Sequence, residues 1–344
     1  MLYVGLDLSR RRVDWQALAC GGERVGGGAV PPDRDGLAGL ARRLGATPVL
    51  AVIESMSGAR FVHDQLELSG WDVRIADAAK ARGLAPLACK TDRIDCWVLA
   101  ELARLGLVPE VWLPDACVRG ERERARFRLH LVKHRRSLKQ RVHAILFQHG
   151  LASPSSDLFG AGGRLYVSRL RLPEPWASTV RASVALIDEL DDQVEQCERE
   201  LRRLGADHRY VPLLTTLPGI AWVLGYTIAA EIGDITRFAS PRKLVGYTGL
   251  TPKVDQSGER DRRGPLRKNG PNYLRWALIE AAHTAGRHPR YRPIVERMRA
   301  RHGRKRGSKI AAIEIARRQT EAIWHMLTND EPFAPAGAPT PLAA

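Results

Sequence analysis

The chain has 344 residues with a hydrophobic fraction of 44%, which is enough to bury one large core or two modest ones. Its formal charge of +16 favours a polyanionic partner. The five cysteines are odd in number and form no C-x-x-C pair, so the sequence indicates neither a disulfide framework nor a zinc ribbon. There is no secretory signal and no apolar run of about 18 residues, so we expect a cytoplasmic protein with no membrane partner.

The charge is distributed unevenly. Residues 1–115 hold 14 basic and 15 acidic side chains, whereas the rest of the chain holds 40 basic and 23 acidic ones. A near-neutral front followed by a cationic back is typical of a catalytic module joined to modules that hold nucleic acid.

Periodicity predicts an α/β module at the front. Three strands are expected at 2–7, 13–19 and 23–30, followed by a helix, a buried strand, a second helix and a fifth strand at 35–44, 48–53, 61–68 and 71–75. This order is expected of a ribonuclease H-like sheet. A further helix is predicted from Asp92 to Leu105, with Thr91 available as its N-cap.

The cationic back is predicted to be mostly helical. Residues 121–149 form a basic helix, and apolar residues recur at roughly heptad spacing over 180–204. Joined through a loop at 153–163, the two helices would form an antiparallel coiled-coil arm or a dimer contact. From 211 we expect a helix-hairpin-helix-like turn at Pro218-Gly219, a Gly-rich basic loop at 246–270 and three helical stretches that end near 327.

Four carboxylates occupy positions that suggest a shared site. Asp7 lies at the carboxyl end of the first strand, and Glu54 directly follows the buried strand. Asp92 and Asp95, three residues apart, share one helix face. Singly, each acid has a structural explanation, as a helix cap, a dipole partner or a surface ion pair. Jointly they favour a Mg²⁺ site, with Mn²⁺ as the substitute, because hard cations prefer oxygen ligands.

Two blocks of motifs resemble one family of mobile-element proteins. The first block consists of Gly5-Leu6-Asp7, Ile53-Glu54, Lys90-Thr91-Asp92-Arg93-Ile94-Asp95 and Ala100-Glu101-Leu102. The second consists of Leu217-Pro218-Gly219-Ile220, Glu231-Ile232-Gly233-Asp234, Phe238, Lys243-Leu244, Gly249-Leu250-Thr251-Pro252, Gln256-Ser257-Gly258 and Asn272-Tyr273-Leu274-Arg275. In this order the blocks resemble the transposases of the insertion sequence 110 family, also called DEDD transposases, and the related Piv DNA invertases.

The resemblance implies a particular domain organisation and chemistry. A RuvC-like DEDD catalytic domain would cover residues 1–115, a helical coiled-coil arm 116–208, and a mostly helical transposase domain 209–330, with a disordered tail at 331–344. It further implies transposition or site-specific recombination of DNA, magnesium dependence and a covalent linkage between DNA and Ser257. The implied partners are double-stranded DNA at element ends and target, a structured noncoding RNA that guides the reaction, and further copies in a homodimer or homotetramer. The implied location is the nucleoid.

Without the resemblance, Ser257 is an ordinary serine before glycine in a polar loop. Three clusters of basic residues, at 120–149, 242–275 and 287–309, favour contacts with nucleic-acid phosphates. We expect such contacts from Arg122, Arg126, Lys133, Arg136, Lys253, Arg260, Arg262, Arg263, Arg267, Lys268, Arg275, Arg304, Lys305 and Arg306. Two alternatives stay open: a Holliday-junction endonuclease that uses water as nucleophile, and a non-catalytic scaffold that binds nucleic acid.

Overall fold

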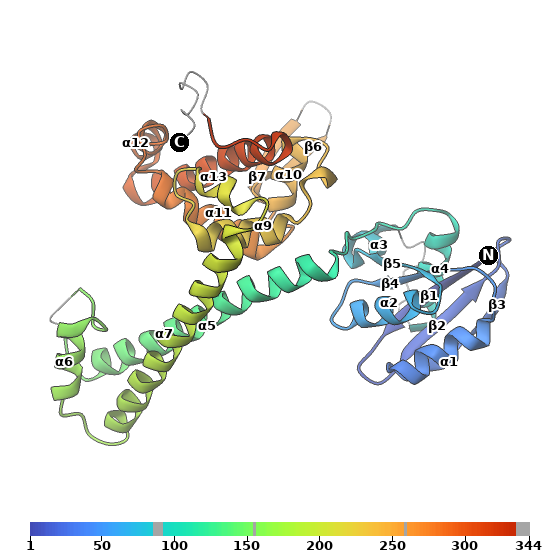
Figure 1. Cartoon of the computed structure of the whole chain (residues 1–344), viewed down its shortest axis with the longest axis horizontal. Helices are drawn as coiled ribbons and strands as arrows, with labels where there is room; N and C mark the ends of the chain where they lie inside the picture. Colours follow the sequence, from blue (N-terminus) through green and yellow to red (C-terminus); the bar gives the residue numbers. More distant parts are fainter. Residues whose placement is uncertain (85–91, 154–155, 258–259, 335–344) are drawn as a thin grey trace. The chain divides into compact units, whose positions relative to one another are not determined.

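A computed structural model describes residues 1–84, 92–153, 156–257 and 260–334 (Figure 1). The chain forms two compact units, Met1–Leu113 and Pro114–Ala344. The predicted N-cap Thr91 lies outside the described residues. Within the described residues, no helix is long and apolar enough to cross a membrane.

The first unit is built on a mixed five-stranded sheet. In spatial order its strands are β3 (Arg24–Val30), β2 (Val13–Leu18), β1 (Leu2–Leu8), β4 (Val49–Glu54) and β5 (Asp72–Ala76). β1, β2 and β3 form an antiparallel meander, and β4 and β5 run parallel to β1. The predicted order of strands and helices is therefore confirmed, and it makes β1 and β4 neighbours at the centre of the sheet.

Helices cover both faces of this sheet because its central strands are apolar on both sides. Alternate residues such as Val4 and Leu6 pack against α1 (Arg34–Leu44) and α2 (Ala59–Glu67). The opposite set, which includes Leu50 and Val52, packs against α3 (Ala78–Leu84) and α4 (Asp92–Arg104). We call this second side the α4 face.

Two long helices open the second unit. α5 (Ala116–Gln148) and α7 (Trp176–Ala206) lie side by side in Figure 1. Their ion pairs run in opposite chain directions, from Arg124–Glu200 through Arg128–Glu198 to Arg135–Asp191, so the helices are antiparallel. The two predicted long helices are confirmed. A short helix that the sequence did not predict, α6 (Ala161–Arg169), packs against their far end around Leu158 and Ile187.

The rest of the second unit is a helical core. It consists of α8 (Val211–Thr215), α9 (Trp222–Ile232), η1 (Ile235–Arg237), α10 (Pro241–Thr248), β6 (Pro252–Ser257), β7 (Arg260–Leu266), α11 (Asn272–Ala285), α12 (Arg292–His302) and α13 (Arg304–Asn329). α9 is buried from Gly225 to its last residue, Ile232. Ala125 of α5 and Leu201 of α7 enter the same core, so the long helices and the C-terminal helices form one unit.

The prediction of a loop over 246–270 is wrong. α10 extends to Thr248, and β6 and β7 pair as an antiparallel hairpin, with Ser257 opposite Arg260. These strands were not predicted because most of their residues are polar, so the apolar alternation that reveals a half-buried strand is missing. The backbone pairing of the hairpin does not depend on that alternation.

The predicted disordered tail begins with an attached segment. The backbone N–H of Phe333 donates to the hydroxyl of Thr216 at 2.8 Å, and the Phe333 ring lies near Arg290. Residues 335–344 lie outside the described residues.

Candidate active site

The first unit positions Asp7 and Glu54 on adjacent strands. β1 and β4 are parallel, and their register pairs Leu6 with Ile53, so the next positions along the two strands are Asp7 and Glu54. Side chains alternate between the faces of a strand. Because Leu6 and Ile53 belong to the core on the opposite side, both carboxylates belong to the α4 face. The predicted meeting of the two strand ends is thus reproduced at the level of the backbone.

Asp14 is a third acid on this face, and it was not predicted as a site residue. Asp14 of β2 is paired in register with Asp7, and its neighbours Val13 and Trp15 belong to the opposite core. Its side chain is 19% exposed and forms an ion pair with Arg12, in which Nε of Arg12 lies 2.7 Å from Oδ2 of Asp14. The meander prediction contained the necessary signal, because the strand at 13–19 must run antiparallel to the strand that carries Asp7.

Gly5 brings α4 into direct contact with the backbone of β1. A Cβ atom built on Gly5 would lie 1.8 Å from the carbonyl oxygen of Cys96 and 2.8 Å from the backbone nitrogen of Ala100. Only a residue without a side chain permits this approach. Gly5 and Asp7 share one face of β1, so the contact brings the first turns of α4, with Asp92 and Asp95, to the side of the sheet that carries Asp7.

The pKa of the Cys96 thiol depends on the charges around this contact. Burial raises the pKa of Cys96, and the carboxylates of Asp7, Asp14 and Asp95 raise it further, to about 12. Three acids from β1, β2 and α4 therefore act on one buried atom. A thiol with such a pKa stays protonated near neutral pH, which makes it a poor metal ligand.

The donor set is chemically suited to a hard divalent cation. Asp7, Glu54 and Asp95 offer carboxylate oxygens, the ligands that Mg²⁺ prefers. Among the side chains that the structure describes, no three acids, histidines or cysteines lie close enough together to hold a metal ion. The side chain of Asp92 lies outside that set. The metal role of the four acids therefore stays a prediction.

One prediction follows from the burial of Cys96, which is 1% exposed. At about pH 8, iodoacetamide is expected to modify the exposed Cys20 and Cys117 while Cys96 stays unmodified, because its pKa is raised and its sulfur is inaccessible. Peptide mapping by mass spectrometry would measure the extent of modification, and denaturation in urea should expose Cys96. Equal modification of Cys96 and Cys20 in the native protein would contradict the packing of α4 on Gly5.

Ser257 is the last residue of β6, at the closed end of the hairpin. Its side chain lies outside the described residues, as do those of Lys253, Arg260, Arg262 and Arg263. The hairpin places all five residues on one two-stranded ribbon. Their predicted roles as nucleophile and phosphate contacts are not tested by the described side chains.

Arg122 and Arg126 contact α9. Arg122 donates to the backbone carbonyls of Ala230 and Glu231 at 2.8 and 2.7 Å. Arg126 forms a two-point ion pair with the Glu231 carboxylate, which is 0% exposed, at 2.7 and 3.0 Å. Burial lowers the pKa of Arg126, but the hydrogen bond and the charge of Glu231 outweigh this effect, so the pKa lies above its ordinary value. Both arginines thus join α5 to α9, and their nucleic-acid contacts stay predictions.

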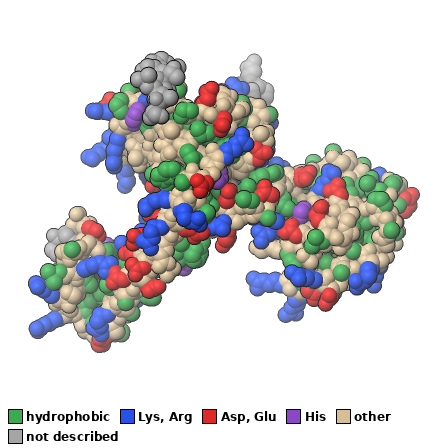
Figure 2. All heavy atoms as spheres, viewed as in Figure 1, with side chains coloured by type: hydrophobic (Ala, Val, Ile, Leu, Met, Phe, Trp, Pro, Cys, Tyr) green, Lys and Arg blue, Asp and Glu red, His purple; other side chains and the backbone are tan. Residues whose placement is uncertain are grey.

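The other predicted basic contacts differ in their surroundings. Arg126 and Lys133 lie over the ring of Tyr273, with the Lys133 nitrogen 5.2 Å from the ring centre. Arg275 donates to the carbonyl of Thr248 at 3.3 Å. The remaining residues with described side chains are exposed: Arg136, Arg267, Lys268, Arg304, Lys305 and Arg306. Figure 2 shows Lys and Arg side chains gathered over the part of the second unit that contains α12.

The Pro218-Gly219 turn joins α8 to α9, as predicted, but it faces the interior. Gly219 has φ +91°, and a Cβ there would lie 2.3 Å from the carbonyl oxygen of Ala281 in α11. Gln319 of α13 donates to the carbonyl of Pro218 at 2.8 Å. The glycine therefore serves helix packing at this turn.

These features define the class of protein: an α/β unit with carboxylates at its central strand ends, joined to a basic helical unit. The chain belongs to the IS116/IS110/IS902 family of transposases. The family model with that description matches residues 211–296, and the transposase model of the DEDD type matches residues 4–150. The second match includes α5 and all of the sheet except the first two residues of β1.

Curated relatives are similar to large parts of the chain. "Putative transposase y4qE" from Sinorhizobium fredii is 34% identical over 58% of this chain and 49% of its own length. The transposase for insertion sequence element IS1328 of Yersinia enterocolitica is 24% identical over 83% of this chain and 86% of its own. The pilin gene-inverting protein of Moraxella bovis is 31% identical over 43% of this chain and 45% of its own. The chain thus spans about half the length of the Sinorhizobium and Moraxella relatives.

Proposed function

We propose that this chain is a DNA recombinase that moves an insertion sequence by cutting and rejoining DNA, with a catalytic first unit of the RuvC-like, ribonuclease H type. One observation carries the proposal. Asp7 and Glu54 share the α4 face on neighbouring parallel strands, and Gly5 holds the helix of Asp92 and Asp95 against that face.

The proposed roles follow from the chemistry of these groups. Asp7, Glu54, Asp92 and Asp95 would hold Mg²⁺ or Mn²⁺ through carboxylate oxygens. Bound metal would stabilise the negative charge that develops on the phosphate during strand transfer. Asp14 is paired with Arg12, so its expected role is to orient β2 beside Asp7.

Ser257 is the proposed nucleophile. Its Oγ would form a bond to phosphorus while the bond from phosphorus to a sugar oxygen breaks, and the serine proton would pass to a nearby base as the sugar oxygen gains one. A phosphodiester then links Ser257 to DNA. Attack on this ester by a sugar hydroxyl of another strand would rejoin the DNA and restore the serine.

The proposed partners follow from the basic surface of the second unit and from the family. Double-stranded DNA at the element ends and the target is the substrate, a structured noncoding RNA guides the choice of site, and a homodimer or homotetramer holds the strands together. Exposed basic residues on α5 and at the start of α13, together with the basic residues of the hairpin, would contact the phosphates.

A covalent-adduct assay tests this proposal. Purified protein, Mg²⁺, co-purified RNA and DNA spanning an element end are expected to give a protein-linked DNA band. Ser257→Ala and Asp7→Asn should reduce the band about 100-fold or more, the size of effect seen when a group that stabilises a transition state is lost. Asp72→Asn is the matched control, because Asp72 is an exposed acid of the same unit that pairs with Arg74.

The alternatives give different results in the same assay. A Ser257→Ala variant that cleaves DNA at the normal rate without an adduct would identify a nuclease that uses water. Wild-type protein that binds DNA but never cuts it would identify a scaffold. Circular dichroism of each variant would separate loss of chemistry from loss of folding.

A further inference from the structure

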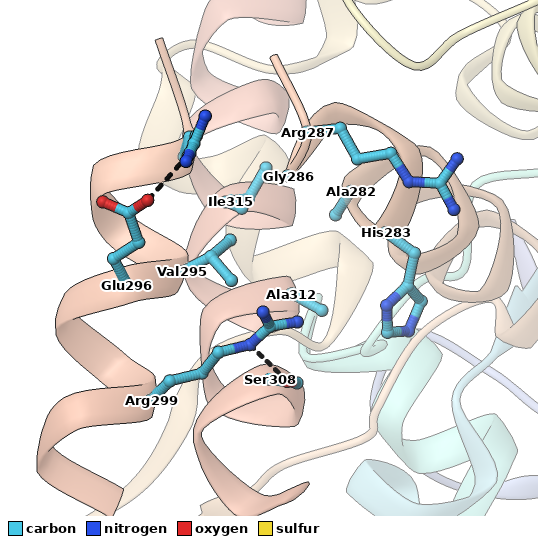
Figure 3. A pocket seen from close by; sticks show the side chains of 11 residues that line it. Ala282, His283, Gly286, Arg287, Val295, Glu296, Arg299, Ser308, Ala312 and Ile315 are labelled. Carbon is cyan, nitrogen blue, oxygen red and sulfur yellow. Dashed lines mark hydrogen bonds and ion pairs between the residues drawn. The ribbon is translucent and has the colours of Figure 1, made fainter. Parts of the chain in front are cut away.

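A pocket of about 580 Å³ lies between α11, α12 and α13 of the second unit (Figure 3). Its floor is apolar and includes Ala282, Val295, Ala312 and Ile315. The volume lies in the range of sites that hold small organic ligands. No role in the proposed function accounts for this pocket.

Cationic side chains surround the apolar floor. Arg287, Arg292 and Arg299 line the pocket together with His283. The one acid in the lining, Glu296, accepts a hydrogen bond from Arg292 at 2.8 Å, so Arg287 and Arg299 remain as positive charge in excess of the acid. A site with this excess favours an anionic ligand.

Arg299 is held in place for such a ligand. Its Nε donates to the hydroxyl of Ser308 at 2.9 Å, and this hydroxyl donates in turn to the carbonyl of Arg304 at 2.6 Å. The serine therefore fixes the guanidinium while the terminal nitrogens stay directed toward the pocket, as Figure 3 shows. A pre-oriented guanidinium matches two phosphate oxygens at once.

Close helix packing fixes the walls. A Cβ on Gly307 of α13 would lie 2.3 Å from the carbonyl oxygen of Met298 in α12, so the two helix backbones touch beside the pocket. A Cβ on Gly286 would lie 3.1 Å from a methyl group of Val295. The walls of the pocket are thus in direct contact with one another.

A neighbouring pocket has a similar volume, about 600 Å³, but a different balance of charge. Arg290, Arg317 and Arg318 line it, but so do Glu314 and Glu321. Glu314 pairs with Arg318 at 3.0 Å and with Arg317 at 3.7 Å. The acids offset most of the positive charge there.

We propose that the pocket between α11, α12 and α13 takes one unpaired nucleotide of a bound nucleic-acid strand. Its phosphate would lie against Arg287 and Arg299, and its base against the aliphatic floor around Val295 and Ile315. A base-paired nucleotide would bring its partner strand between the same helices, so we expect the pocket to favour single strands over a duplex. This inference rests on the proposed function, because it requires that the chain binds nucleic acid.

Binding of labelled oligonucleotides to the full chain tests the inference. Fluorescence anisotropy would be measured with a short single-stranded DNA, the RNA of the same sequence and the matching blunt DNA duplex. Loss of a charged hydrogen-bond donor predicts that Arg299→Ala weakens binding of single strands about tenfold and binding of the duplex less than about threefold. Ser308→Ala should give a smaller loss in the same direction. Arg318→Ala, which removes the same charge from the neighbouring pocket, is the control.

The outcomes separate this inference from the proposed function. No binding of any oligonucleotide by the wild type would overturn both. Binding that Arg299→Ala and Arg318→Ala weaken equally, or that falls equally for single strands and duplex, would overturn the nucleotide pocket alone. Competition by inorganic phosphate as strong as by a nucleoside monophosphate would overturn the role of the apolar floor. The DNA and RNA arms identify which strand supplies the nucleotide.

Discussion

Replacing Gly5 by alanine is expected to lower the free energy of unfolding of the first unit by about 3 kcal/mol or more, the upper end of the effect of overpacking. The added methyl group would lie 1.8 Å from the carbonyl oxygen of Cys96 and 2.8 Å from the backbone nitrogen of Ala100. Both atoms belong to the backbone of α4. Backbone atoms cannot rotate aside as a long side chain can. α4 must therefore move away from β1, which exposes the apolar contacts of Val98 and Leu99.

Urea unfolding followed by the fluorescence of the buried Trp15 and Trp71 would measure this loss. Gly39→Ala is the matched control, because its Cβ would meet only the end of the Arg42 side chain, at 3.9 Å. In a helix, this control is expected to raise stability by up to about 1 kcal/mol. Equal stability of Gly5→Ala and wild type would show that α4 does not touch β1 at Gly5.

The same substitution should also reduce DNA cleavage, since α4 carries two of the four proposed metal ligands. A shift of about 1 Å at such a site can cost about 100-fold in rate. Cleavage would be compared at a temperature where most of the variant is folded. If the Gly5→Ala variant were destabilised but cleaved DNA at the wild-type rate, the position of α4 would not matter for cleavage.

Replacing Arg126 by alanine is expected to destabilise the second unit by about 3–5 kcal/mol, because the substitution leaves a buried carboxylate without its ion-pair partner. Glu231 is 0% exposed, and Arg126 contacts both of its oxygens. Adding Glu231→Gln to Arg126→Ala should recover a large part of the loss, because the amide carries no charge to bury. Thermal or urea unfolding would measure both variants.

Arg124→Ala is the control for Arg126. Arg124 lies on the same helix and pairs with Glu200 at 3.1 Å, but both side chains are about half exposed, at 46% and 48%. A loss below about 1 kcal/mol is expected for such a surface pair. If Arg126→Ala kept wild-type stability and lost nucleic-acid binding, the prediction from charge clustering would be correct and the structural role of Arg126 would be wrong.

Much of the candidate site was predictable because its signals are local. Short runs of apolar residues located β1 and β4, and the first acid after each run marked the strand end. The three-residue spacing of Asp92 and Asp95 likewise depends only on helix geometry. Asp14 was missed although its strand was predicted, because its importance comes from its pairing with Asp7 in the sheet.

The basic residues show the limit of such reasoning. A run of arginines on one helix indicates a positively charged surface. It does not indicate which guanidinium pairs with a buried carboxylate far away in the sequence, as Arg126 pairs with Glu231, 105 positions further along the chain. The hairpin of β6 and β7 was missed for a related reason, since its polar strands carry no apolar period.

The sequence by itself determined the division of charge, the order of strands and helices in the first unit, and the candidate set of acids, because periodicity and spacing act over a few residues. Only the tertiary structure decided that Gly5 contacts Cys96, that Asp14 joins Asp7, that Arg122 and Arg126 bind α9, and that three helices enclose a cationic pocket. Those contacts join distant segments, and the packing of side-chain volumes and buried charges selects them after the local elements have formed.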